Sequence, residues 1–239
     1  MNYALLLSGG TGTRTGSLMP KQYVKADGLM MVTYALRAFF ASGHIDPLYV
    51  VSDIEWREAI VEDVAKAGFD ASKIRDFALP GENRQLSILN GMEKILSDNG
   101  GEAGEEDTVI VHDAARPFLT EELLDRCYGA LKGHDGVMPV VPMKDTVYRS
   151  FDGKGISELL NRSEIFAGQA PELFAFKKYY EANRSLLPDR IKNVSGASEP
   201  AILAGMDIAM VTGDEKNCKV TTAEDLMAFL NSFGSRNFN

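Results

Sequence analysis

Several features that would place this chain of 239 residues in a particular class of protein are absent. Its two cysteines, Cys127 and Cys218, have neither the spacing of a metal site nor that of a disulfide framework, which indicates a reducing compartment. Its three histidines are scattered, which argues against a His-rich metal centre. No run of about 18 apolar residues occurs, and the first residues do not resemble a signal peptide. We therefore expect a cytoplasmic protein that does not bind a membrane.

Positive charge is also scarce, because the formal net charge is -9 and the sequence pI is about 4.9. Nucleic acid is therefore not the expected partner, since phosphate backbones attract basic surfaces. A small anionic substrate remains compatible with this charge, provided that local Lys, Arg and backbone N–H groups bind it. With 45% hydrophobic and 25% charged residues, the composition is that of a folded globular protein.

Apolar runs alternate with segments of helical periodicity along the chain. We predict buried strands at Tyr3–Leu7, Leu48–Val51, Thr108–Val111, Val137–Val141 and Ile208–Val211. We predict helices at residues 31–42, Glu55–Ala67, Arg84–Leu96, Thr120–Leu131 and Thr222–Phe233. This alternation predicts an α/β fold with a Rossmann-like, mostly parallel sheet and helices on both faces. In such sheets ligands bind outside the carboxyl ends of the strands.

The first candidate binding segment, residues 8–22, begins where the first strand ends. Its glycines would let backbone N–H groups approach a phosphate, and Arg14 and Lys21 would supply positive charge. A flexible loop is the alternative interpretation. A P-loop is excluded because the sole Gly-Lys pair, Gly153-Lys154, precedes another glycine. The glycines of the segment also lack the Gly-x-Gly-x-x-Gly spacing of a dinucleotide-binding fingerprint.

Other polar segments follow predicted strands or precede predicted helices. Asp113 ends a buried strand, where a carboxylate is a natural Mg²⁺ ligand, and its neighbour His112 is interpreted as structural. Lys219 precedes the last helix, where it could hold a phosphate. Each segment also has a plain alternative, which is helix capping or a solvated charge. The remaining segments of this kind are Gly81–Ser87, Lys144–Thr146, Leu160–Ser163 and Gln169–Glu172.

Taken together and in order, these segments resemble the cytidylyltransferases that act on small polyol phosphates. The two closest families are 2-C-methyl-D-erythritol 4-phosphate cytidylyltransferase and ribitol-5-phosphate cytidylyltransferase, and the resemblance runs from about Tyr3 to Leu226. Its most specific parts are Gly-x-Gly-x-Arg followed by Pro-Lys-Gln-Tyr, then His-Asp-Ala-Ala-Arg-Pro, then Asn-x-Lys-x-Thr-Thr-x-Glu-Asp-Leu. The resemblance implies one nucleotidyltransferase domain over residues 1–239 that moves CMP from CTP to a polyol phosphate and releases pyrophosphate.

Carried over residue by residue, the resemblance implies that CTP is held by Gly9, Gly10, Gly12, Gly81, Glu82, Arg84, Ser87 and Ala114. The implied catalytic cations are Arg14, Lys21 and Lys219. Asp113 would position Mg²⁺ and the acceptor, and the polyol phosphate would be bound by Asp113, Arg116, Thr146 and Arg162. An inserted arm at about 143–166 would cross to a second subunit, so that Thr146 and Arg162 complete the partner's site. A homodimer is therefore expected.

The sequence leaves open which polyol phosphate is the acceptor. Residues 112–117 favour 2-C-methyl-D-erythritol 4-phosphate, an isoprenoid precursor, whereas Ser8-Gly9-Gly10 is closer to the ribitol 5-phosphate enzymes, which make CDP-ribitol for cell-wall or capsule polymers. Val194–Ser198 stands where both families carry Thr-Asp. The alternatives are a nucleotidyltransferase of the same fold that uses another nucleotide or a sugar 1-phosphate, or a non-catalytic nucleotide-binding homologue. A scaffold would not need the whole set of charged residues, which favours an enzyme.

Overall fold

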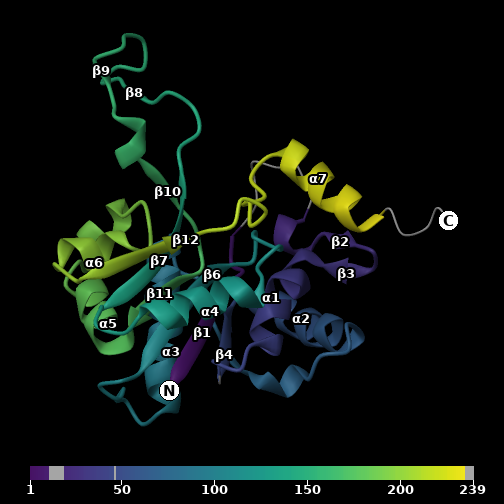
Figure 1. Ribbon diagram of the computed structural model, residues 1–239. Coiled ribbons are helices and arrows are strands. Elements are labelled where there is room, and N and C mark those ends of the chain that lie inside the picture. Colours follow the sequence, from purple (N-terminus) through teal and green to yellow (C-terminus); the bar gives the residue numbers. More distant parts are fainter. Residues whose placement is uncertain (11–18, 46, 235–239) are drawn as a thin grey trace.

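The computed structural model describes residues 1–10, 19–45 and 47–234. Within them the central sheet has eight strands, and seven of these follow the order β10-β7-β11-β6-β1-β4-β5 while β12 pairs with β7 (Figure 1). The sheet strands are β1 (Asn2–Leu7), β4 (Leu48–Val51), β5 (Ile74–Ala78), β6 (Thr108–Asp113), β7 (Gly136–Pro142), β10 (Phe166–Gly168), β11 (Glu172–Ala175) and β12 (Ile208–Thr212).

Most neighbouring strands run in the same direction. β1 is parallel to β4 and β6, β4 is parallel to β5, and β12 is parallel to β7. β11 lies antiparallel between β6 and β7, and β10 is antiparallel to β7. The predicted mostly parallel sheet is confirmed. The pattern missed β5, which carries two charges in Ile-Arg-Asp-Phe-Ala, and the short strands β10 and β11.

Helices cover both faces of the sheet, as predicted for a Rossmann-like fold. One face packs against α1 (Met31–Ala41), α2 (Ile54–Lys66) and α4 (Glu121–Ala130). The other face packs against α3 (Arg84–Asp98), α5 (Phe176–Arg184) and the region of α6 (Glu199–Leu203). The last helix, α7 (Ala223–Gly234), packs beside α1 and β2 (Lys25–Ala26) rather than on the sheet (Figure 1).

Strand β1 shows how one apolar run serves both layers. Ala4 and Leu6 belong to the cluster under α1, α2 and α4, whereas Tyr3 and Leu5 belong to the cluster under α3 and α5. This division follows from the alternation of side chains along a strand. Each fully buried leucine contributes about 1.5–3 kcal/mol. The strand is therefore held from both sides, and its carboxyl end is a rigid support for the loop that follows.

Side-chain caps set where two helices begin. The Thr120 hydroxyl accepts the Leu123 N–H at 3.3 Å at the start of α4, where sequence placed a cap. Asn83 caps α3 in the same way, with its Oδ1 accepting the Leu86 N–H at 2.8 Å. The short elements between the main ones are η2 (Lys21–Tyr23), β2 (Lys25–Ala26), β3 (Leu29–Met30), η3 (Ala71–Lys73) and η5 (Arg190–Asn193).

The segment predicted as an arm leaves the body of the molecule after β7 and returns at β10. It contains the hairpin of β8 (Tyr148–Arg149) and β9 (Glu158–Leu159), followed by η4 (Arg162–Glu164). Figure 1 shows the hairpin standing far from the sheet. In the described part of the chain, no helix combines the length and apolarity that a membrane span requires.

Candidate active site

A pocket of about 450 Å³ lies at the carboxyl edge of the sheet. Its walls come from the residues that follow β1 and β6, from the start of α3, and from Lys219 ahead of α7. Every described residue that the sequence assigned to CTP or to catalysis lines it: Gly9, Gly10, Lys21, Gly81, Glu82, Arg84, Ser87, Ala114 and Lys219. Asp113 lines it as well. Two further assigned residues, Gly12 and Arg14, lie outside the described residues.

The glycine-rich loop after β1 is anchored by side chains from η2. The Gln22 Nε2 donates to the backbone oxygens of Ser8 at 2.7 Å and Gly10 at 2.6 Å. The Tyr23 hydroxyl donates to the Ser8 oxygen at 2.7 Å. Sequence reasoning quoted Gln22 and Tyr23 within a motif but assigned them no role. Their positions next to Lys21 in the sequence could have indicated this role. A loop that binds phosphate has to be fixed in place, and hydrogen bonds from side chains outside the loop can do this.

Two glycines are required by close packing at this pocket. A Cβ on Gly9 would lie 2.3 Å from the Pro80 Cβ, and a Cβ on Gly81 would lie 2.4 Å from the Leu86 Cβ. Real Cβ atoms do not approach so closely, so Gly9 lets the loop after β1 pack against Pro80 of the loop after β5, and Gly81 lets that loop pack against the start of α3. Gly9 and Gly81 therefore form part of the wall of the pocket, and the binding of a phosphate there stays a prediction.

The N-terminus of α3 opens onto the same pocket. The Ser87 hydroxyl accepts the Gly81 N–H at 3.0 Å and donates to the Asn83 oxygen at 2.8 Å, so it shapes the turn that leads into the helix. Gly81, Asn83 and Ser87 line the pocket beside this helix end. A helix N-terminus carries partial positive charge, which favours an anion there.

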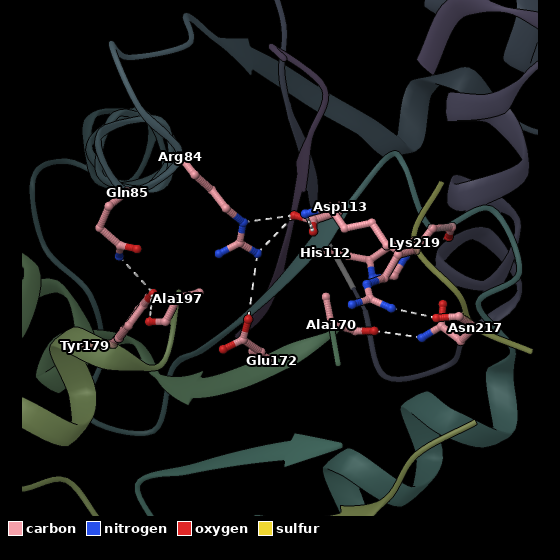
Figure 2. A network of polar contacts seen from close by, with 11 residues as sticks. Arg84, Gln85, His112, Asp113, Ala170, Glu172, Tyr179, Ala197, Asn217 and Lys219 are labelled. Atoms are coloured by element: carbon pink, nitrogen blue, oxygen red, sulfur yellow. Dashed lines mark hydrogen bonds and ion pairs between the residues drawn. The ribbon is translucent and has the colours of Figure 1, made fainter. Parts of the chain in front are cut away.

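Asp113, at the end of β6, joins two cations of the pocket, Arg84 and Lys219. Its Oδ1 accepts hydrogen bonds from Arg84 Nε at 3.0 Å and Arg84 Nη2 at 2.9 Å, and its Oδ2 accepts one from Lys219 Nζ at 2.7 Å. Figure 2 shows Asp113 between Arg84 on one side and Lys219 on the other. Residues 84, 113 and 219 come from three separate parts of the sequence, and the parallel sheet brings them to one edge.

The electrostatics of this network favour full ionisation. Burial raises the pKa of Asp113, but the charges of Arg84 and Lys219 outweigh burial and hold that pKa well below its usual value. Burial lowers the pKa of Arg84, and the charges of Asp113 and Glu172 more than restore it. Asp113 is therefore an anion at neutral pH, flanked by two cations that a triphosphate could also engage.

A second pocket of about 250 Å³ adjoins the first and shares Arg84, Asp113 and Lys219 with it. Arg116, which the sequence assigned to the polyol phosphate, lines this second pocket, and its Nη1 donates to the Asn217 backbone oxygen at 2.7 Å. Residues 195–198 line it too, within the segment where the sequence departs from both families. The departure therefore lies at a wall of the pocket.

Glu172 is a member of the second pocket that sequence reasoning quoted but assigned no role. It opens β11, and its side chain lies 3.7 Å from Arg84 Nη2 (Figure 2). Burial raises the pKa of Glu172 to about 7, although the Arg84 charge lowers it. Its position depends on the antiparallel insertion of β11 between β6 and β7, which no local pattern indicated.

His112 has the structural role that the sequence assigned. It is fully buried, its Nε2 lies 3.1 Å from the Arg116 backbone oxygen, and its ring meets Phe39 edge-on. Burial lowers the pKa of His112 to about 4, so the imidazole is neutral at physiological pH. A neutral, enclosed ring supports the turn after β6 and does not face the pocket.

Thr146 and Arg162 do not line either pocket of their own chain. Both belong to the arm, where the Arg162 Nη1 donates to the Lys144 backbone oxygen at 2.6 Å. The prediction that they reach a partner's site stays a prediction.

The donor set is compatible with a magnesium ion that arrives with its substrate. Among the described residues, no group of three or more His, Cys, Asp or Glu side chains is placed to hold a metal. Asp113 is the carboxylate that faces both pockets. Mg²⁺ is commonly bound by one or two carboxylates together with substrate phosphates and water, so the Asp113 carboxylate beside this pocket fits such an ion.

Comparisons with known proteins agree with this geometry. A family model described as "IspD: 2-C-methyl-D-erythritol 4-phosphate cytidylyltransferase" matches residues 3–230. A protein of that name from Geobacter metallireducens is 33% identical over 229 residues, which covers 94% of each chain. A ribitol-5-phosphate cytidylyltransferase from Lactiplantibacillus plantarum is 29% identical, with 95% of each chain covered. A crystal structure of a 4-diphosphocytidyl-2C-methyl-D-erythritol synthase is 25% identical, with a TM-score of 0.76 over 96% of this chain and 97% of the other.

Proposed function

Because the chain belongs to the family of 2-C-methyl-D-erythritol 4-phosphate cytidylyltransferases, we propose that it transfers CMP from CTP to 2-C-methyl-D-erythritol 4-phosphate, a step of isoprenoid precursor synthesis. The observation that carries the proposal is the pair of pockets that meet at Arg84, Asp113 and Lys219. A reaction between two phosphate-bearing substrates needs two adjoining sites with shared positive charge at their junction. The pockets provide this arrangement.

The larger pocket suits the nucleotide. Its backbone at Gly9, Gly10 and Gly81 lies beside the N-terminus of α3, which favours phosphate groups. Lys21 and Lys219 face the same space from opposite ends of the chain. The smaller pocket then receives the acceptor, with the acceptor's phosphate at the junction and its polyol chain directed toward Glu172 and residues 195–198.

The reaction requires no covalent intermediate with the protein. A phosphate oxygen of the acceptor attacks the α-phosphorus of CTP, a new P–O bond forms, and the bond from the α-phosphorus to the bridging oxygen breaks as pyrophosphate leaves. The attacking oxygen is already anionic, so no strong base is needed. Catalysis then rests on positioning and on stabilising charge, which is the role of Arg14, Lys21 and Lys219 in this proposal.

Mg²⁺ is the metal proposed for this site, with Asp113 as the protein ligand. When bound, Mg²⁺ supplies neutralisation of the negative charge on the reacting phosphates. Arg84 and Lys219 hold the Asp113 carboxylate at the junction of the two pockets. Since Oδ1 accepts two hydrogen bonds and Oδ2 accepts one, Oδ2 is the oxygen that would ligate the ion where the phosphates of both substrates meet.

A homodimer through the arm is the proposed assembly. The arm exposes apolar side chains that a monomer would leave in water: Tyr148, Phe151, Ile156, Leu159 and Phe166. Phe151 is 87% exposed. Grouped exposed apolar residues mark interaction surfaces, so these residues support an arm that packs against a second copy, where Thr146 and Arg162 would reach the partner's acceptor pocket. The proposed location is the cytoplasm, in agreement with unpaired Cys127 and Cys218.

Pyrophosphate release tests the function directly. The native protein, CTP and Mg²⁺ are combined with either 2-C-methyl-D-erythritol 4-phosphate or ribitol 5-phosphate, and the variant Lys219→Ala serves as the control. We expect release with the methylerythritol acceptor at a kcat/KM at least about 10-fold above that with ribitol 5-phosphate, a difference of about 1.4 kcal/mol. The reverse order would assign the activity of the 29% identical relative. Silence with both acceptors, while CTP raises the melting temperature, would contradict the proposal.

A further inference from the structure

The second pocket offers an unusual group for a site that receives a phosphate ester. Beyond the junction at Arg84, Asp113 and Lys219, its wall contains the carboxylate of Glu172. The residue is 8% exposed and opens the antiparallel strand β11. Burying a carboxylate costs free energy unless its oxygens accept hydrogen bonds. The contacts of Glu172 therefore show how many of these hydrogen bonds the protein provides.

The described contacts of this carboxylate leave much of its capacity for hydrogen bonds unused. The Ser198 backbone N–H is near enough to lower its pKa, and Arg84 Nη2 lies 3.7 Å from Oε1, beyond hydrogen-bond distance. A carboxylate accepts about four hydrogen bonds. The raised pKa of Glu172 agrees with this, because burial outweighs the Arg84 charge.

Two other polar side chains of the same pocket make hydrogen bonds within the protein. The Gln169 Nε2 donates to the Asp214 backbone oxygen at 2.9 Å, and its Oε1 accepts the Asp214 N–H at 2.9 Å. Arg116 Nη1 donates to the Asn217 backbone oxygen at 2.7 Å, whereas its buried Nε has no hydrogen-bond partner among the described residues. These contacts tie Gln169 and Arg116 to the loop ahead of α7. Glu172 lines the same cavity, and its described side-chain contact is the ion pair with Arg84 at 3.7 Å.

We propose that Glu172 is a specificity residue, whose carboxylate accepts hydrogen bonds from hydroxyl groups on the chain of the acceptor. This inference rests on the proposed function, since it takes the acceptor's phosphate to lie at the junction of Arg84 and Lys219. The acceptor class that fits is a short polyol with one phosphate. At a pH above about 7, where Glu172 is mainly ionised, a second phosphate or a carboxylate at the far end of that chain would meet Glu172 and be rejected by like charge.

A different role for Glu172 would be to hold Arg84 in place for CTP. The two roles predict different kinetics. If Glu172 binds acceptor hydroxyls, its replacement changes the KM for the acceptor and leaves the KM for CTP nearly constant. A residue that acts through Arg84 changes the KM for CTP, because Arg84 lines the nucleotide pocket.

The test uses Glu172→Gln, which keeps the size of the side chain, and Glu172→Ala, which removes the acceptor oxygens. Glu105→Gln, at an exposed residue paired with Lys177 near α5, is the matched control for loss of one carboxylate. Initial rates are measured with 2-C-methyl-D-erythritol 4-phosphate and with n-butyl phosphate, which has the chain length without the hydroxyls. Calorimetric titration of both phosphates in the presence of the α,β-methylene analogue of CTP measures binding without turnover.

We expect Glu172→Ala to raise the KM for the methylerythritol acceptor about 10-fold or more while the KM for CTP changes less than about 2-fold, as loss of a charge-assisted hydrogen bond predicts. The preference of the native protein for the polyol over n-butyl phosphate should shrink by a similar factor in Glu172→Ala. Glu172→Gln should accept erythritol 1,4-bisphosphate better than the native protein does. Glu105→Gln should behave as native.

Equal preference for polyol and n-butyl phosphate in native and Glu172→Ala proteins would overturn the inference and leave the proposed function intact. A rise in the KM for CTP that matches the rise for the acceptor would also overturn it, in favour of a role through Arg84. If the native protein neither binds nor uses any polyol phosphate, the proposed function fails, and the inference fails with it.

Discussion

Loss of the Arg84 guanidinium should destabilise the native protein far more than loss of a comparable surface ion pair. The perturbation is Arg84→Met, which keeps most of the apolar stem and removes the charge. Arg84 gives two hydrogen bonds to one oxygen of Asp113, at 3.0 and 2.9 Å, and the two side chains are 30% and 10% exposed. The variant would leave the buried Asp113 carboxylate with Lys219 as its partner.

The magnitude follows from this burial. Removing one partner of a buried ion pair costs about 3–5 kcal/mol. Lys219 still neutralises part of the Asp113 charge, so we expect a loss of about 2–3 kcal/mol in the free energy of unfolding. Asp113→Asn should relieve much of this loss when combined with Arg84→Met, which gives a coupling energy of about 1–2 kcal/mol in the double-mutant cycle.

Urea unfolding at pH 7, without nucleotide or metal, measures these differences. The arm provides a matched control in Arg149→Met, because Arg149 pairs with Glu158 at 2.8 Å while the two side chains are 53% and 50% exposed. That variant should lose less than about 0.5 kcal/mol. Equal small losses in both variants would refute the reasoning, since they would mean that solvent screens the Arg84–Asp113 pair as well as it screens the surface pair.

Three further predictions concern the pocket. Lys219→Ala and Lys21→Ala should each lower kcat for pyrophosphate release by about 10²-fold or more, and near-native turnover would contradict the assigned role. Gly81→Ala should cost about 1–3 kcal/mol in urea unfolding because its Cβ meets α3, whereas Gly10→Ala, with open space, should cost less. Between pH 4.5 and pH 7, the free energy of unfolding of Glu172→Gln should rise by about 2–3 kcal/mol relative to that of the native protein. The reason is that the pKa of the native carboxyl is raised to about 7, so the native protein loses stability as the pH rises over this range. Parallel plots of unfolding free energy against pH for the two proteins would contradict this.

Local patterns predicted the parts of the site that lie on continuous motifs. The buried run of β1, the loop with Gly9 and Gly10, and the start of α3 are each encoded by neighbouring residues. The Thr120 cap of α4 is local in the same sense. Such features depend on periodicity and on hydrogen bonds between residues three or four apart, so a single sequence reveals them.

Glu172 shows what those patterns do not contain. It belongs to the Gln169–Glu172 motif noted from the sequence. Its position in the pocket, however, depends on β11, a four-residue strand that lies antiparallel between β6 and β7. Gln22 is a similar case, because its contacts are backbone oxygens of Ser8 and Gly10 on another element. Pairing of this kind is set by contacts between distant parts of the chain, which short-range spacing does not record.

The sequence by itself determined the α/β class, the strand and helix that carry the nucleotide pocket, and the chemistry expected there, because alternating hydrophobicity and glycine-rich turns act locally. The tertiary structure alone decided which charges meet. Asp113 lies between Arg84 and Lys219 because β6, α3 and the segment ahead of α7 end at one edge of the sheet. The pKa values of these groups depend on their burial and on the neighbouring charges. Burial is a property of the whole fold rather than of any one segment.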